Sequence, residues 1–155
     1  MAVTFDFSGL PKYEARVRDA AAKGLNDAAV TLQKSMKNVQ QQTPRTGKKN
    51  PKHVPSKPGE PPARQDGHLF RNIVHQQATP ANLVARAGTK LKYGRFLEFG
   101  HMARFGSSQN PKAGPPTYVH PRPWVFVALQ DARAKMVEAF KSGARASLRT
   151  GGARK

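Results

Sequence analysis

The sequence predicts a single α+β domain, with a long N-terminal helix and a C-terminal helix packed on a small antiparallel sheet and a long basic, proline-rich arm. Three observations support this: helical periodicity over residues 10–42, the same periodicity over residues 123–149, and short β-like runs with turn signals between them. A chain of 155 residues normally forms one domain. Only 37% of the residues are apolar and 13 are proline, so we expect part of the chain to lie outside the core.

The first helix is expected over residues 10–42. Ser8 can cap its start, and Pro11 suits the first turn, where a missing N–H does no harm. Thr43 precedes Pro44 and should end the helix, because the residue before a proline disfavours helical angles. Its apolar positions recur at steps of three or four: Tyr13, Val17, Ala21, Leu25, Ala28, Leu32, Met36 and Val39.

Residues 43–67 are predicted to form a basic arm that projects from the domain. Val54 is almost the only apolar residue apart from the prolines, so burial of this segment alone cannot offset the entropy lost on ordering. Two interpretations stay open: a solvated linker, or an arm that orders against a neighbouring subunit or a phosphate backbone. The candidate interface residues are Lys48, Lys49, Lys52, Lys57, Pro58, Pro61, Pro62 and Arg64.

Residues 68–122 should hold the sheet and a short helix. The runs "LFRNIVHQQ" and "ANLVARAGT" resemble two strands joined by the turn-forming "ATPAN". The segment from Lys92 to Gly100 favours a short helix ended by the glycine. The aromatic residues of the chain lie in apolar stretches and are expected in the core. A second loop is expected over residues 101–117, which are rich in Gly, Pro, Ser and Asn.

The last helix is expected over residues 123–149, followed by a flexible basic tail at 150–155. One face carries the apolar residues Trp124, Val127, Ala128, Ala132, Met136, Phe140 and Ala144. Lys141, Arg145 and Arg149 form an i, i+4, i+8 stripe near the C-terminal end, where cations also favour the helix dipole. This stripe is a candidate contact for DNA or for an acidic protein surface.

The composition argues against an enzyme and predicts no cofactor. There is no cysteine, so thiolate chemistry, disulfides and cysteine zinc sites are excluded. The five histidines form no close metal-binding motif, and no phosphate-binding loop or nucleophile motif occurs. No apolar run reaches 18 residues, which predicts a soluble protein without a membrane partner. The net charge of +18 attracts nucleic acid or acidic protein surfaces.

Three motifs occur in a fixed order: "PGEPPARQDGHLFRNI", then "YGRFLEFG", then "HPRPWVFVAL". Together they resemble the neck and tail-completion proteins of long-tailed bacteriophages, a family that includes tail-completion protein Z of lambda-like phages. The resemblance covers roughly residues 10–145. The matching positions are Pro61, Pro62, Gly67, Leu69, Ile73, Tyr93, Glu98, Phe99, Gly100, Arg122, Pro123 and Trp124. The sequence departs from the family pattern at Asp66, Gly94 and His101.

The resemblance implies a structural virion protein that acts in the host cytoplasm during assembly and then in the neck of the particle. Such a protein would form a homo-oligomeric ring, six-fold or related, around the DNA channel, in contact with other neck and tail proteins. The family motifs would be structural: glycines for turns, Trp124 as an anchor, and Glu98 paired with Arg95 or Arg122, or else solvated. Nonspecific contact with packaged DNA would be electrostatic.

Two other classes of function remain open. A nonspecific nucleic-acid-binding accessory protein would explain the charge and predicts strongly salt-dependent DNA binding. A metal-dependent nuclease would need an acidic or histidine cluster, and the nine carboxylates are scattered along the chain.

Overall fold

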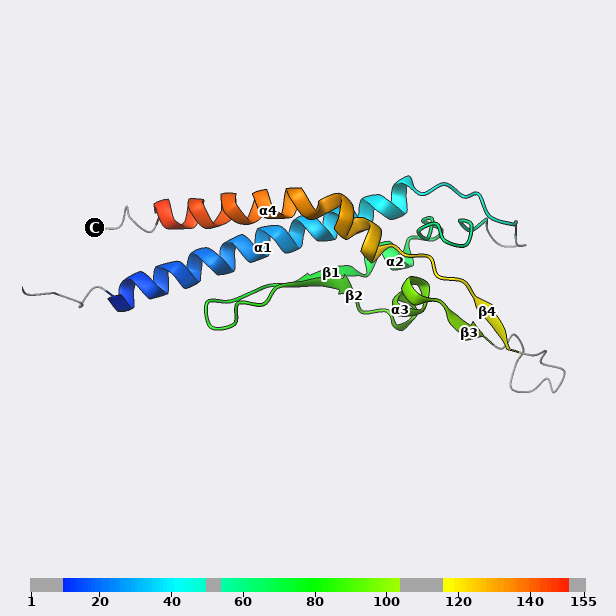
Figure 1. Cartoon of the computed structure of the whole chain (residues 1–155), viewed down its shortest axis with the longest axis horizontal. Helices are drawn as coiled ribbons and strands as arrows, with labels where there is room; N and C mark the ends of the chain where they lie inside the picture. Colours follow the sequence, from blue (N-terminus) through cyan, green and yellow to red (C-terminus); the bar gives the residue numbers. More distant parts are fainter. Residues whose placement is uncertain (1–9, 50–53, 104–115, 151–155) are drawn as a thin grey trace, which may run out of the picture. The chain divides into compact units, whose positions relative to one another are not determined.

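The computed structural model describes residues 10–49, 54–103 and 116–150. It has the predicted α+β composition, with a long helix at each end of the described chain and short strands between them (Figure 1). The helices are α1 (Leu10–Gln42), α2 (His68–Arg71), α3 (Lys92–Phe99) and α4 (Val125–Thr150). The strands are β1 (Ile73–Gln76), β2 (Arg86–Thr89), β3 (His101–Ala103) and β4 (Thr117–Val119).

Among the described residues the strands form two separate two-stranded sheets, β1–β2 and β3–β4, rather than one. The β1–β2 pair confirms the strands predicted on either side of "ATPAN". The β3–β4 pair contradicts part of the loop predicted over residues 101–117, because β3 lies wholly within that segment and β4 begins at its last residue. Strands of only three residues carry too little periodicity to be recognised. They pair antiparallel, with His101 opposite Val119 and Ala103 opposite Thr117.

The start of the first predicted strand is a helical turn instead. Leu69 and Phe70 lie in α2, and the strand begins only at Ile73. The Asp66 carboxylate accepts a hydrogen bond from the His68 N–H at 3.0 Å, which stabilises a turn at this point. Gly67 follows Asp66 with φ 79°, a left-handed conformation that a side chain disfavours.

The contacts of the chain fall into two groups. The first comprises the described parts of Met1–Leu32, His75–Ala87 and Ala132–Lys155. In it, the first half of α1 runs antiparallel to the second half of α4. Arg16 Nη2 donates to the Leu148 carbonyl at 3.0 Å, and a Cβ on Gly24 would lie 2.7 Å from the Phe140 carbonyl oxygen. The glycine therefore allows the two backbones to approach closely.

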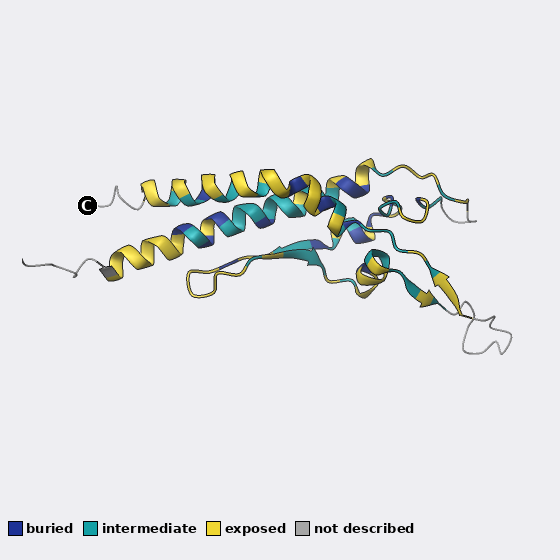
Figure 2. Ribbon diagram, in the orientation of Figure 1, coloured by how far each residue is buried: buried dark blue, intermediate teal, exposed yellow. Residues whose placement is uncertain are grey.

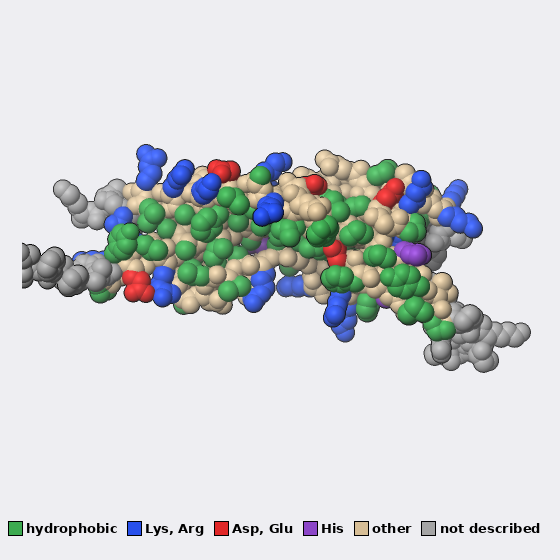
Figure 3. All heavy atoms as spheres, viewed as in Figure 1, with side chains coloured by type: hydrophobic (Ala, Val, Ile, Leu, Met, Phe, Trp, Pro, Cys, Tyr) green, Lys and Arg blue, Asp and Glu red, His purple; other side chains and the backbone are tan. Residues whose placement is uncertain are grey.

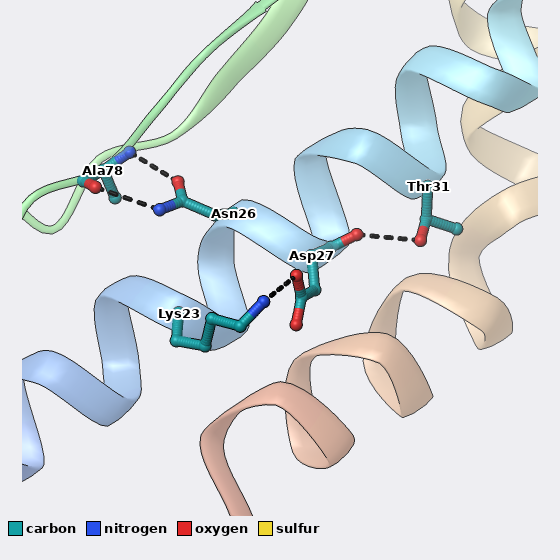
Figure 4. Close-up of polar contacts among 5 residues, drawn as sticks. All are labelled: Lys23, Asn26, Asp27, Thr31 and Ala78. Carbon is teal, nitrogen blue, oxygen red and sulfur yellow. Dashed lines mark hydrogen bonds and ion pairs between the residues drawn. The ribbon is translucent and has the colours of Figure 1, made fainter. Parts of the chain in front are cut away.

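A side chain on α1 ties the segment after β1 to this helix pair. Asn26 donates to the Ala78 carbonyl at 3.1 Å and accepts from the Ala78 N–H at 2.7 Å, as a neighbouring strand would (Figure 4). On the same helix, Lys23 pairs with Asp27 at 2.8 Å, and the Thr31 hydroxyl donates to the Asp27 carbonyl.

The second group comprises Gln33–Val74 and Gly88–Asp131. Its largest buried side chains include Trp124, Met36 and Ile73, each at most 1% exposed. Gln33 Nε2 donates to the Ile73 carbonyl, and the Ser35 hydroxyl donates to the Ala128 carbonyl, so both β1 and α4 are hydrogen-bonded to the second half of α1.

The apolar stripe of α1 is buried only in part. Met36 and Val39 are buried, as the periodicity predicts, but Tyr13 is 64% exposed and Val17 is 43% exposed. Figure 2 shows the first turns of α1 as exposed and its later turns as largely buried or intermediate. The buried alanines of α1 are Ala20, Ala22 and Ala29, which are neighbours of the predicted stripe positions rather than members of it. Helical periodicity therefore identifies the helix and the buried residues near its C-terminal end, but not the buried face of its first two thirds.

The described part of the arm lies against its own chain rather than projecting from it. Gly47 N–H donates to the Pro55 carbonyl at 2.7 Å, Arg64 N–H to the Gln40 carbonyl at 3.0 Å, and Gly59 N–H to the Pro121 carbonyl at 3.0 Å. Backbone polar groups thus satisfy one another although apolar side chains are few. No described helix is long and apolar enough to cross a membrane.

Candidate assembly surface

The Glu98 carboxylate on α3 holds the start of α4. Its Oε2 accepts from the N–H groups of Trp124 at 2.8 Å and Val125 at 2.9 Å, and its Oε1 accepts from Phe126 at 3.0 Å. The first N–H groups of a helix have no partner within it, and the positive end of the helix dipole favours an anion there. Neither Arg95 nor Arg122 forms an ion pair with Glu98 among the described residues, so the predicted pairing is wrong.

Trp124 anchors the same junction. The indole is 1% exposed, and its Nε1 donates to the Gly94 carbonyl of α3 at 3.4 Å. A Cβ on Gly94 would overlap with Thr89 Cγ2 and lie 3.7 Å from Trp124 Cζ2. The absence of a side chain at Gly94 thus lets α3 lie close to both.

Two further residues of the third motif, Pro121 and Arg122, are also held. Arg122 N–H donates to the Leu97 carbonyl at 2.6 Å, and Pro121 accepts from Gly59 in the proline-rich segment. Residues from all three motifs therefore meet within the second contact group, through backbone hydrogen bonds and the Glu98 cap.

The motif glycines occupy conformations that favour glycine. Gly100 ends α3 with φ 71°, as predicted, and a Cβ there would lie 2.7 Å from the Val119 carbonyl oxygen of β4. Gly67 is buried beside Leu69, which is 8% exposed. Both glycines are structural in this fold.

Large apolar side chains next to this junction are exposed. Phe96 is 47% exposed, Phe99 70%, Met102 62%, Tyr118 48% and Phe126 56%. We call these five residues the assembly face. Met102 and Tyr118 are directly opposite in the β3–β4 register, so their side chains point to the same side of the ribbon. Figure 3 shows hydrophobic side chains over α3 and the β3–β4 strands.

The expectation that the aromatics of the α3 segment lie in the core is therefore wrong. Tyr93 is 39% exposed and hydrogen-bonded through its hydroxyl to His68 Nδ1 at 3.2 Å, while Phe96 and Phe99 are more exposed still. In the sequence, four large apolar residues within seven positions gave only a hint, because one short helix cannot bury them all on one side. Several exposed apolar side chains around one junction favour an interaction site, and aromatic residues and Met are enriched at interfaces.

The predicted basic contacts lie at the surface where they are described. Lys48, Lys49, Lys57 and Pro58 are exposed, Pro61 and Pro62 are half-buried, and Lys52 lies outside the described residues. In the α4 stripe, Lys141 pairs with Glu138 at 3.0 Å, so its charge is partly matched. Arg145 and Arg149 are exposed and line a shallow groove of ≈ 270 Å³ with Ser142.

Two carboxylates in the proline-rich segment are stabilised in the ionised form. The Thr46 hydroxyl and then the Lys57 N–H lower the pKa of Glu60, and the His68 N–H lowers the pKa of Asp66. Burial, and then the negative charge of Asp66, raise the pKa of Tyr93. The hydrogen bonds to Glu60 and Asp66 stabilise turns in the proline-rich segment. None of these contacts places a nucleophile beside a general base.

Within the part of the chain that the structure describes, no group of three His, Asp or Glu side chains could hold a metal ion. No protein-family model, no curated protein and no solved structure matches the chain.

Proposed function

We propose that this protein is a structural component of a phage neck or tail, and that copies of it form a ring at the head–tail junction around the DNA channel. The observation that carries the proposal is the assembly face, because its five exposed apolar residues need a partner to leave water. The resemblance of the three ordered motifs to tail-completion proteins supplies the identity of the assembly.

The arrangement of the motifs supports this role. The motif residues connect α3 to the start of α4 by hydrogen bonds. Glu98 accepts from the first N–H groups of α4, the Trp124 indole donates to the Gly94 carbonyl, and the Arg122 N–H donates to the Leu97 carbonyl. Such a junction presents the neighbouring apolar side chains on a defined scaffold. A closed ring requires one surface to meet a different surface on the next copy, and the assembly face would supply one of the two.

The exposed part of the arm is a second contact to the neighbouring subunit in this proposal. Lys48, Lys49 and Lys57 extend from a segment whose backbone is hydrogen-bonded to its own chain. They would meet acidic patches on the adjacent copy or on other neck proteins.

The test combines assembly with imaging. Phe99→Glu and Met102→Glu place a charge on the assembly face, while Val137→Glu places the same charge at a 48% exposed position on α4. All three variants should keep wild-type thermal stability, because the altered side chains are exposed. We expect the first two to abolish incorporation into particles and the third to permit it.

Cryo-EM reconstruction of the particle neck then locates the wild-type protein. A ring at the head–tail junction with the assembly face covered is the expected result. Absence of this chain from neck and tail, or normal particles from Phe99→Glu and Met102→Glu, would overturn the proposal.

One alternative is favoured by a specific observation. The charge of +18, together with the exposed Arg145 and Arg149 beside a polar groove, would also suit a nonspecific nucleic-acid-binding accessory protein. Salt-dependent DNA binding by the free protein is compatible with either function, so the result that distinguishes the alternative is the absence of an ordered ring in the particle.

A further inference from the structure

A pocket of ≈ 220 Å³ lies between the proline-rich segment, α2 and α3, all within the second contact group. Its lining runs from buried Gln40 and Ser56 to exposed Arg64 and Asp66, so the pocket reaches the surface. Pro55, Pro62, Leu69 and Leu97 supply apolar parts of its wall. The volume is below the roughly 300–1,000 Å³ of sites for whole drug-sized ligands, and suits a single side chain.

The pocket wall contains an uncompensated cation. Arg122 is half-buried, and no carboxylate lies within ion-pair distance of it among the described residues. Its Nη2 has only a long hydrogen bond of 3.4 Å to the Ser56 carbonyl, and its Nε is buried without a partner in the described chain. A charge taken partly out of water without an opposite charge is unfavourable.

Two further polar atoms in the same wall are unsatisfied. Gln40 Nε2 and Ser56 Oγ belong to side chains that are 2% and 1% exposed, and neither atom has a hydrogen-bond partner in the described chain. Buried polar atoms are almost always paired, so three unpaired atoms around one pocket are unusual. All three are closed to solvent in this structure, so a ligand reaches them only when the side chains of Gln40, Ser56 and Arg122 turn toward the pocket. The Gln40 amide N–H, the Arg122 guanidinium N–H and the Ser56 hydroxyl can all donate hydrogen bonds. The matching partner is therefore a group that accepts them.

The nearest acid does not fill this role. Asp66 lines the pocket, but its carboxylate accepts the His68 N–H at the exposed end. Arg64, the other lining cation, lies with its guanidinium 4.5 Å from the centre of the Phe70 ring. The pocket thus has two cations, apolar walls and no carboxylate that pairs with Arg122.

We propose that this pocket receives the side chain of a glutamate presented by another protein chain, with the carboxylate bound by Arg122 and supported by Ser56 and Gln40. The methylenes of the glutamate would lie against the apolar walls. Arginine binds carboxylates through two parallel N–H groups, which gives geometric selectivity as well as charge pairing. The proposal is independent of the phage assignment, since it requires only an acidic partner for a chain of net charge +18.

Titration of the full chain with blocked tripeptides tests the proposal. Acetyl-Gly-Glu-Gly-amide should shift the amide NMR signals of pocket residues with a dissociation constant of about 1 mM. Acetyl-Gly-Gln-Gly-amide, which has the same shape without the charge, should bind at least about tenfold more weakly. Equal binding of the two peptides, or shifts outside the pocket only, would overturn the proposal.

Variants separate binding from folding. Arg122→Gln should weaken binding of the glutamate peptide by about tenfold or more, whereas Arg145→Gln, which removes the same charge from α4, should leave it unchanged. Ser56→Ala and Gln40→Met should also weaken binding, yet the melting temperature without peptide should stay level or rise. Removing an unpaired buried polar atom does not destabilise a fold.

A purely structural role predicts the opposite pattern. If Ser56→Ala and Gln40→Met lower the melting temperature and leave peptide binding intact, these atoms serve the fold through bound water and the proposal is wrong.

Discussion

At the residue scale, the packing of Thr89 and Trp124 around Gly94 leaves no room for a side chain at that position. A Cβ at this position would overlap with Thr89 Cγ2. Rotation of Thr89 could relieve the overlap, but its Oγ1 accepts the Leu91 N–H at 3.2 Å, which favours the present rotamer. The two positions are therefore coupled.

We expect Gly94→Ala to destabilise the protein by about 1–3 kcal/mol, the usual range for overpacking. In a Thr89→Ser background the methyl group is absent and the hydroxyl remains, so the same change should be neutral or stabilising by up to about 1 kcal/mol, the helix-propensity gain. Urea unfolding of the four proteins gives the coupling free energy. An identical effect of Gly94→Ala in both backgrounds would show that Thr89 is not the obstacle.

The sequence around single residues predicts the role of Gly100 but not that of Glu98. Gly100 was identifiable as the end of a helix because a glycine follows an apolar run at the right spacing. The role of Glu98 was not, because its three partners lie 26 to 28 residues later in the sequence. A lone carboxylate carries no sequence signal for a helix start that far away.

At the scale of elements, the junction of α3 and α4 depends on one carboxylate with two accepting oxygens. Glu98→Ala should destabilise the protein by about 1–3 kcal/mol, because three N–H groups at the start of α4 lose their acceptor. Glu98→Gln should fall between wild type and Glu98→Ala, since an amide offers one acceptor oxygen and its NH₂ group would face an N–H.

The matched control is Glu138→Ala, which removes a carboxylate from an exposed pair with Lys141. Exposed pairs contribute about 0–1 kcal/mol, so its effect should be small. Chemical denaturation of the three variants measures the difference. If Glu98→Ala lowers the free energy of unfolding no more than Glu138→Ala does, water molecules replace the Glu98 carboxylate as acceptors for the N–H groups of α4.

The long elements were the most predictable part of the fold. Both α1, with 33 residues, and α4, with 26, are long enough for the helical spacing of their apolar residues to be recognised. The short elements were not predictable: α2 has four residues, and β3 and β4 have three each, so local propensity carries almost no information. What decides them is the set of hydrogen bonds around them, such as the one from His68 to Asp66.

At the scale of the whole molecule, cationic side chains occur in both contact groups. Some of them are paired with a carboxylate and others are not. Arg18 and Lys23 on α1 each pair with an acid, whereas Arg145 and Arg149 have no carboxylate within ion-pair distance among the described residues. Only cations that are free to meet phosphates release counterions on binding.

We therefore expect duplex DNA binding by the free protein to weaken steeply between about 50 and 200 mM salt. Arg145→Gln combined with Arg149→Gln should reduce the slope of log affinity against log salt by about 2, whereas Arg18→Gln with Lys23→Gln, of equal net charge, should change it less. Fluorescence anisotropy across a salt series measures both slopes. Equal losses in the two double variants would show that only the overall field matters.

The assembly face could not be recognised at this scale from sequence. Aromatic residues in an apolar stretch suit a core as well as an interface, and only the fold shows that α3 buries Gly94 while leaving Phe96 and Phe99 in water. Charge, by contrast, is a property of composition and was predictable as a feature that attracts acidic partners.

The Glu98 cap has a consequence for how such a chain can vary. Because the start of α4 is fixed from α3, and the β3–β4 register is fixed by His101 opposite Val119, the number of residues between β3 and β4 does not determine where α4 begins. A change in the number of residues between Ala103 and Thr117 should therefore leave the first residues of α4 where they are, because the three hydrogen bonds to Glu98 set that position.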